Sequence, residues 1–209
     1  MTDPIVVGDR TYVHFSRMTP FTGKVEDRGF LSPKKKRIRL KDTRGAYVPV
    51  DGHNILFVID GETVSPGSDD WNFIQQVAQK LAESYDRLNP RAKEALKQLV
   101  AVVFAKSPKR SFASVKKSCF FYDIDEFLRS DGSRVRAQWV ASNIVHDANH
   151  VRLFKIGRKH AGFAAEVECW QLQVENRDAL GLDQVEVDHL GGFIRNPETA
   201  GQRMEEDAF

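Results

Sequence analysis

Two histidines four residues apart carry the clearest chemical signal in the sequence. His146 and His150 enclose Asp147 in the segment VHDANHV, within a longer apolar stretch. In an α-helix, residues four apart lie on the same face one turn from each other, so both imidazoles can approach one metal ion. Asp147 follows the first histidine, where a carboxylate can accept a proton from a metal-bound water. The segment therefore predicts a metal site with hydrolytic chemistry.

A catalytic zinc site takes three protein ligands and leaves a fourth position for water. The next apolar stretch, AAEVECW, offers Glu166 and Glu168 as the third ligand. Charged and polar side chains inside an apolar helix are costly unless a metal or hydrogen bonds satisfy them. A network of hydrogen bonds in the core, or a polar stripe facing water, is the alternative explanation for the same residues.

Helices and a strand must position these groups. Apolar residues at helical spacing predict a largely buried helix over residues 134–154. A second helix is expected over residues 163–180, and it should end at Gly181 because glycine favours the position just after a helix. Residues 118–124, SCFFYDI, predict a buried strand ahead of both helices.

The remaining segments predict more strands and two earlier helices. Residues 1–65 are rich in β-branched and aromatic residues broken by Gly, Pro and Asp, which is typical of short strands. One helix should begin after the cap signal at residues 66–70, and another at Asn89-Pro90. The apolar run at 100–105 fits a strand or a helix end equally well. The prediction is an α+β fold, with a strand-rich part at 1–65, a second domain at 66–194 and a polar tail at 195–209.

The segment ASNIVHDANH, followed by AEVEC, resembles the gluzincin type of zincin metallopeptidases. That family carries His-Glu-x-x-His on an active-site helix and a third ligand, Glu, on a second helix. The resemblance implies a minimal zincin-like domain, in which these two helices pack on a small sheet, and it implies peptide-bond hydrolysis with Zn²⁺. The implied zinc ligands are His146, His150 and Glu166, with Glu168 as the fallback, and Asp147 takes the place of the catalytic Glu.

The resemblance also implies how a peptide or protein substrate binds. The strand at 118–124 would be the sheet edge along which an extended peptide is laid by strand addition. The departure from the family is Asp147, whose carboxylate is one methylene, or about 1.5 Å, shorter in reach than that of Glu. Because displacements of this size can cost about a hundredfold in rate, hydrolysis is less firmly expected than metal binding.

Other residues can contribute to such a site, and the sequence does not choose among them. An oxyanion stabiliser is chemically available from four side chains, namely Tyr122, Arg158, His160 and His189. Asn143 and Asn149 could orient the imidazoles, although capping and solvent exposure explain them equally well. Cys169 fits a small buried residue better than a ligand.

Two other functions compete with a peptidase. Adjacent His146 and Asp147 also resemble HD-type phosphohydrolases, but these need a histidine on a preceding helix, and the nearest upstream one, His53, lies in a strand-like segment. The second is a non-catalytic binding module, in which the basic stretch KKKRIRLK at residues 34–41 (beginning at Lys34 and ending at Lys41) contacts an acidic partner or nucleic acid. An edge strand with one charged face is the simpler explanation for that stretch.

The composition bears on the partners and the cellular compartment of the protein. Thirty-one Lys and Arg against 29 Asp and Glu leave a net charge of +2, so overall charge gives no argument for nucleic acid or a membrane. Cys119 and Cys169 lie in apolar stretches, which fits buried thiols in a reducing compartment. Neither a signal peptide nor an 18-residue apolar run is present, so we expect a cytoplasmic protein, with non-classical export as an effector left open. No pattern indicates an oligomeric state.

Overall fold

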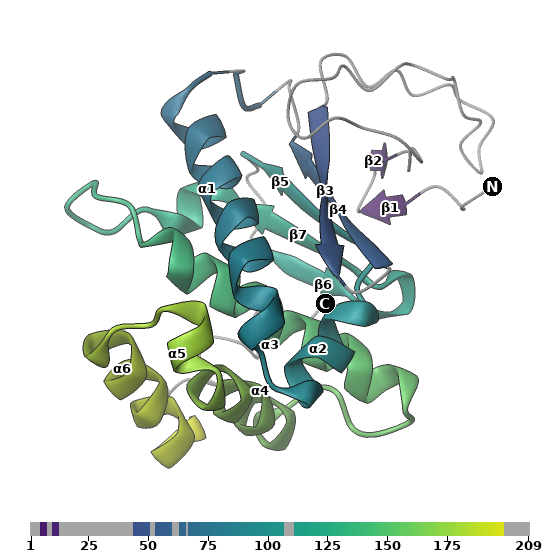
Figure 1. Ribbon diagram of the computed structural model, residues 1–209, viewed down its shortest axis with the longest axis vertical. Helices are drawn as coiled ribbons and strands as arrows, with labels where there is room; N and C mark the ends of the chain where they lie inside the picture. The colour runs from purple at the N-terminus through teal and green to yellow at the C-terminus, as the bar shows by residue number, and fades with distance from the viewer. Residues whose placement is uncertain are drawn as a thin grey trace.

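The computed structural model describes residues 5–7, 10–12, 44–50, 53–59, 63–65, 67–106 and 111–198. The basic stretch at 34–41 and residues 199–209 of the predicted tail lie outside these ranges. The described chain mixes helices with a small sheet, which is the α+β class in its coarse sense (Figure 1). Among the described residues, no helix is both long enough and apolar enough to cross a membrane.

The main sheet is mixed and has the strand order β3-β4-β5-β7-β6. Its three central strands are parallel, and the outer strands β3 and β6 each pair antiparallel with their neighbour. A short antiparallel pair, β1-β2, forms a second sheet. The strands are β1 (Ile5–Val7), β2 (Arg10–Tyr12), β3 (Arg44–Val50), β4 (His53–Ile59), β5 (Ala101–Ala105), β6 (Phe112–Ser114) and β7 (Cys119–Asp123).

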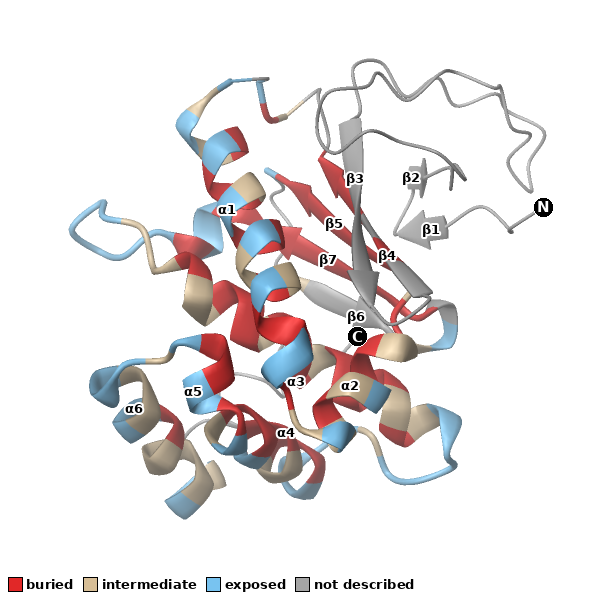
Figure 2. Cartoon of the chain, in the orientation of Figure 1, coloured by how far each residue is buried: buried red, intermediate tan, exposed pale blue. Residues whose placement is uncertain are grey.

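The apolar run that the sequence left open is strand β5. All residues of β5 and β7 are buried (Figure 2), and central parallel strands buried in this way show continuous apolar runs rather than alternation. Strand β4 pairs with β5 in the register Leu56↔Ala101 to Ile59↔Phe104. Strands on both sides of residue 65, the predicted boundary, therefore belong to one sheet.

Two helices connect β4 to β5 and cover one face of the sheet. Helix α1 (Asp69–Ser84) begins where the Ser68 side chain accepts a hydrogen bond from the Trp71 backbone. Helix α2 (Pro90–Lys97) follows the short 3₁₀ helix η1 (Tyr85–Arg87), and it has the predicted Asn89 cap with proline at its first position. The core joins their apolar faces to alternate strand residues, among them Ile55, Phe57, Val102, Phe104, Phe120 and Tyr122.

Helix α3 (Ala137–Lys155) is the predicted long buried helix and packs against α1, α2 and α4. Because it has neighbours on several sides, 12 of its 19 residues are buried, which explains apolar positions on more than one face. Two short 3₁₀ helices lie before it, η2 (Val115–Lys117) and η3 (Ile124–Phe127).

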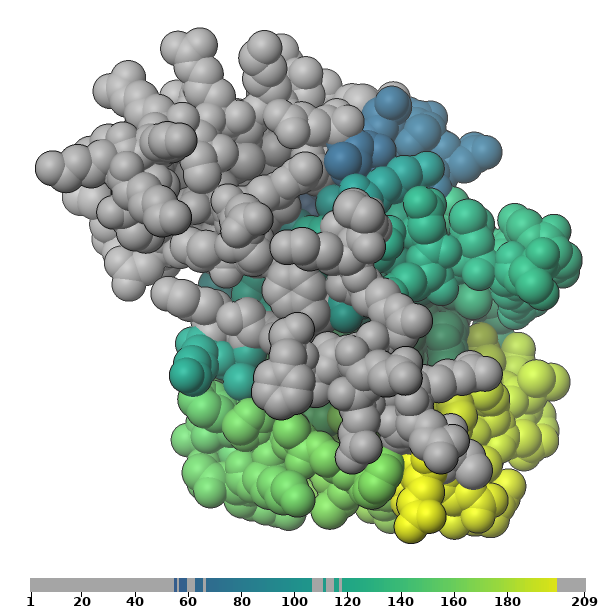
Figure 3. Space-filling model, turned by 180° about the vertical axis from the view of Figure 1, so that it is seen from behind, coloured from purple at the N-terminus to yellow at the C-terminus, as the bar shows by residue number. Residues whose placement is uncertain are grey.

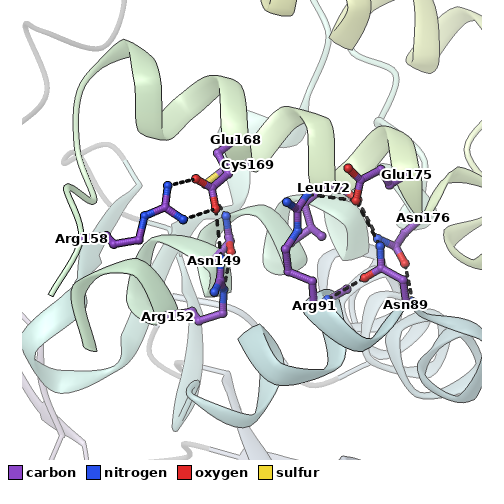
Figure 4. A network of polar contacts seen from close by, with 11 residues as sticks. Asn89, Arg91, Asn149, Arg152, Arg158, Glu168, Cys169, Leu172, Glu175 and Asn176 are labelled. Atoms are coloured by element: carbon purple, nitrogen blue, oxygen red, sulfur yellow. Dashed lines mark hydrogen bonds and ion pairs between the residues drawn. The ribbon is translucent and has the colours of Figure 1, made fainter. Parts of the chain in front are cut away.

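The helix expected over 163–180 is interrupted. Helix α4 (Phe163–Glu175) and helix α5 (Arg177–Leu180) meet at Asn176, a buried residue with non-helical backbone angles. The Asn176 side chain donates to the Leu172 carbonyl at 2.7 Å and accepts from the Asn89 backbone N–H at 2.7 Å, so it joins this junction to the start of α2 (Figure 4). Gly181 ends α5 in the left-handed conformation, as predicted.

A sixth helix, α6 (Gln184–Arg195), was not predicted. Its signal is a capping box, in which Asp183 and Glu186 each accept a hydrogen bond from the other's backbone. Helix α6 packs on α4, and the described chain from α4 to α6, green to yellow, lies at one end of the molecule (Figure 3).

The expectation that the strand at 118–124 forms a sheet edge was wrong. Strand β7 pairs with β5 on one side and with β6 on the other, in the register Phe112↔Phe121 to Ser114↔Cys119. The reason is that residues 112–114 form a strand that the sequence analysis did not recognise in a polar, basic segment. In the described sheet the outer strand next to β7 is β6.

Candidate metal centre

Helix α3 presents His146 and His150 to helix α4. Both residues are buried, at 7% and 8% exposure, and their rings meet edge-on with centroids 4.9 Å apart. Their Nε2 atoms are 3.1 Å apart. The spacing of four residues has therefore placed the two imidazoles on one face, as the sequence analysis expected.

Each imidazole is fixed by an acceptor at its other nitrogen. His146 Nδ1 lies 3.0 Å from Gln173 Oε1, and His150 Nδ1 lies 2.7 Å from the backbone carbonyl of His160. A carbonyl oxygen only accepts, so both Nδ1 atoms carry the proton and donate it. An imidazole that is neutral then has its lone pair on Nε2, the tautomer that metal-binding histidines adopt when an outer partner holds Nδ1, whereas an imidazole protonated at both nitrogens donates from Nε2.

Gln173 is itself oriented by two further residues. Its amide nitrogen donates to Ser142 Oγ at 2.9 Å and to Asn143 Oδ1 at 3.2 Å. These bonds turn the amide oxygen toward His146. Asn143 thus acts on the first histidine through Gln173, whereas Asn149 bonds elsewhere, to Cys169 and Arg152.

Glu166, on helix α4, completes the group. Its Oε2 lies 3.0 Å from His146 Nε2, and its Oε1 lies 3.3 Å from His150 Nε2. Burial alone would raise the pKa of this carboxyl, but hydrogen bonds and charge from the two histidines hold it well below its usual value. Glu166 is therefore an ionised carboxylate, and a proton or a cation must lie among these atoms to balance it.

Glu168 has a different environment. It bonds Arg152 Nη2 at 3.0 Å and Arg158 Nη2 at 2.7 Å, as Figure 4 shows. Of the two candidate glutamates, the structure brings only Glu166 together with both histidines. The sequence could not separate them, because the distinction depends on which face of α4 meets α3.

Asp147 lies on the side of α3 that faces the sheet. It is half-buried, and its carboxylate accepts a hydrogen bond from the Tyr122 hydroxyl on β7. Burial raises the pKa of Asp147 above its usual value, and burial together with the Asp147 charge raises the pKa of Tyr122 far above its own. Tyr122 therefore stays protonated and is a permanent donor to Asp147.

Cys169 lies one turn beyond Glu166 on α4 and is fully buried. Its Sγ atom and one ring nitrogen each of His146 and His150 all lie within 4.8 Å of one another. Three such atoms could bind a metal ion. Burial raises the pKa of the Cys169 thiol, and interactions with His150 and Asn149 act in the opposite direction. From the sequence, a small buried residue was the favoured explanation for Cys169 and a metal ligand the alternative.

The other oxyanion candidates have partners of their own. Arg158 is paired with Glu168, and the His160 ring packs edge-on against Phe154 with centroids 5.0 Å apart. The His189 ring lies 4.3 Å from that of Phe193. The residues that sequence reasoning missed are Gln173 and the His160 carbonyl; Gln173 lies seven residues after Glu166, which is the same-face spacing of a helix.

The sequence matches no known protein-family model, and neither the curated proteins nor the solved structures yield a match. The candidate centre therefore rests on its own geometry. Helices α1 and α2, which precede α3, carry no histidine, and Asp147 bonds Tyr122. These observations do not favour an HD-type site.

Proposed function

We propose that the protein is a zinc-dependent peptidase of minimal zincin-like architecture, with α3 as the active-site helix and α4 as the ligand helix. The observation that carries the metal centre is the set of ligand atoms contributed by His146, His150 and Glu166. The two Nε2 atoms are 3.1 Å apart, Glu166 Oε2 lies 3.0 Å from that of His146 and Glu166 Oε1 lies 3.3 Å from that of His150. These distances are close to the roughly 3.3 Å between donor atoms around a tetrahedral zinc with bonds of about 2.0–2.1 Å.

The donor set also fits zinc chemically. Two neutral imidazoles and one carboxylate are a standard ligand set of catalytic zinc, and the Nδ1 partners of both histidines match the outer interactions that such ligands use. When bound, the metal lowers the pKa of a coordinated water to about 7 and so supplies a nucleophile at neutral pH.

Asp147 is the proposed general base. Its carboxylate adjoins the first histidine in the chain, and one of its oxygens accepts the Tyr122 hydroxyl hydrogen. A carboxylate held in this way has a second oxygen with which to accept a proton from water. Tyr122 then holds the orientation of the shorter Asp side chain.

Substrate binding by strand addition is proposed for β6, since this strand and not β7 is the outer one in the described sheet on that side. An extended peptide pairing there would gain main-chain hydrogen bonds. A peptide or protein substrate thus remains the proposed partner.

Metal content of purified variants tests the centre. We expect about one zinc per chain in the parent and in Glu168→Gln, which alters the arginine-paired neighbour. His146→Ala and Glu166→Gln should lose the metal while circular dichroism shows their helices intact. Equal zinc in all four proteins would contradict the assignment of ligands.

Hydrolysis is tested separately with a library of fluorogenic peptides. The parent should cleave members of the library, and Asp147→Asn should keep its zinc and lose at least about a hundredfold in kcat. A zinc-loaded parent that cleaves no peptide would overturn the peptidase assignment and leave the metal centre standing. Loss of zinc in Asp147→Asn would make Asp147 a ligand, as in HD-type phosphohydrolases.

A further inference from the structure

We infer that Cys169 is a fourth protein ligand of the metal at His146, His150 and Glu166, so that the resting centre has four protein ligands. This inference rests on the proposed metal centre and adds a regulation to it. Structural zinc sites are closed by four protein ligands, whereas catalytic ones keep a position for water. Hydrolysis would then require that water displace the Cys169 sulfur.

The helix geometry supplies two donors from each helix. His146 and His150 are four residues apart on α3, and Glu166 and Cys169 are three apart on α4, so each pair lies on one helix face. The two helices pack against each other, which turns these faces together. Cys169 is thus placed by the same packing that brings Glu166 to the histidines.

The sulfur is close enough to join the centre. Its group with the two imidazoles spans at most 4.8 Å between ligand atoms. Bonds of about 2.3 Å to sulfur and 2.0–2.1 Å to nitrogen place these atoms about 3.5 Å apart around tetrahedral zinc. The sulfur therefore needs to approach the two nitrogens by little more than about 1 Å. On binding, the S–H bond breaks, a sulfur–metal bond forms and the thiol proton leaves to solvent.

A second observation concerns the donor that faces the sulfur. Asn149 is fully buried, and its amide nitrogen donates to Cys169 Sγ at 3.3 Å. Arg152 Nε donates to Asn149 Oδ1 at 2.9 Å, and Glu168 holds Arg152 in turn (Figure 4). A thiol sulfur is a weak acceptor, so an oriented and buried N–H is better matched to a metal-bound thiolate.

Cys119 offers a matched comparison. It is the only other cysteine in the chain, it lies on β7, and burial raises its pKa to about 12. Its sulfur donates only to the Phe120 carbonyl among the hydrogen bonds of the described residues, at 3.7 Å. Cys119 is therefore a buried thiol outside the centre, and its removal should leave the metal unaffected.

Cobalt substitution tests the inference, because a thiolate bound to Co²⁺ gives an intense near-ultraviolet charge-transfer band that imidazole and carboxylate ligands lack. We expect this band in the cobalt-loaded parent and in Cys119→Ala, and its loss in Cys169→Ala and Cys169→Ser. Zinc affinity should fall at least about tenfold in both Cys169 variants, as losing even an outer partner costs 10–100-fold. Peptide hydrolysis should rise in Cys169→Ala, because the position for water is then free.

The outcomes separate this inference from the proposed function. Bound cobalt without the band overturns ligation by Cys169 and leaves the three-ligand centre intact. A parent that binds neither cobalt nor zinc overturns both. Should the Cys169 variants fail to fold, the band in Cys119→Ala still decides the question, because Cys169 is then the only sulfur of a cysteine left in the chain.

Discussion

At the scale of single residues, the proposed metal centre depends on side chains outside the set of proposed ligands. Gln173 holds His146 through Nδ1 and is fixed by Ser142 and Asn143. Gln173→Ala frees the imidazole to rotate or to change tautomer, so zinc affinity should fall 10–100-fold as measured by competition with a chelating dye. The matched control is Gln171→Ala, which removes an exposed glutamine from the same helix. Equal affinities in the two variants would show that Gln173 does not orient the ligand.

Tyr122 gives a second prediction at this scale. Tyr122→Phe removes the hydroxyl that binds Asp147 and keeps the ring packed in the core. We expect zinc content to stay the same and kcat to fall by up to about a hundredfold, because an ångström of misplacement at a reacting group costs this much. KM should change little, since the hydroxyl is proposed to act on Asp147 and not on the peptide. An unchanged kcat would contradict the positioning role.

Residue spacing was sufficient to predict that some of these residues lie together. The His146 and His150 pair depends only on helical periodicity, and Glu166 was among the two glutamates offered by the next helix. The bond from Tyr122 to Asp147 could not be foreseen, because it joins residues 25 positions apart through the packing of α3 on β7. The approach of the Cys169 sulfur to His146 and His150 could not be foreseen either, because it depends on how α3 and α4 pack.

At the scale of elements, Asp70 joins three segments. It lies in the first turn of α1, pairs with Lys106 just after β5 at 2.8 Å, and bonds Arg134 in the segment before α3. Burial alone would raise the pKa of Asp70, but these two cations lower it below its usual value. An ion pair of this kind contributes on the order of 1 kcal/mol of stability when part of it is exposed.

The pH dependence of this ion pair follows from the direction of the shift. Because the folded-state pKa lies below the unfolded one, the contribution is fully present above about pH 4 and is lost as pH falls through the folded value. Asp70→Asn should therefore be less stable than the parent at pH 7 in urea unfolding, and the difference should shrink as the pH falls below about 4. Asp69→Asn, at the exposed neighbouring position, is the control. A difference that is constant from pH 7 to 2 would exclude the ion pair as its source.

The sequence predicted the helix boundaries that depend on local residues, and it missed the features that depend on contacts with other segments. The Asn89 cap with Pro90 and the left-handed Gly181 are local signals, and both elements end or begin where expected. The break at Asn176 depends on a bond to the Asn89 backbone, 87 residues away, so no local pattern could reveal it. Strand β7 is internal because it pairs with β6, a strand of only three residues within a polar, basic segment.

At the scale of the whole molecule, the metal should stabilise the fold. His146, His150 and Glu166 are buried together between α3 and α4, so a bound cation would balance the charge of the carboxylate. A ligand at 100 times its Kd stabilises the folded state by about 2.7 kcal/mol, which corresponds to roughly 5–10 °C in Tm for a chain of this size. We expect a chelator to lower the Tm of the parent by this amount and to leave that of His146→Ala unchanged. Equal shifts in both proteins would assign the effect to another site.

The proposed ligands and the partners that orient the histidines all lie between Ser142 and Gln173, on two consecutive helices and the segment joining them. These contacts join residues at most 31 positions apart, whereas the parallel pairing of β4 with β5 joins residues 45 positions apart, so the contacts of the site need less loop closure and form faster. The pair of helices α3 and α4, which carries the proposed metal centre, thus belongs to the part of the chain that can organise before β4 pairs with β5. A metal captured there would reach the growing fold before the sheet is complete.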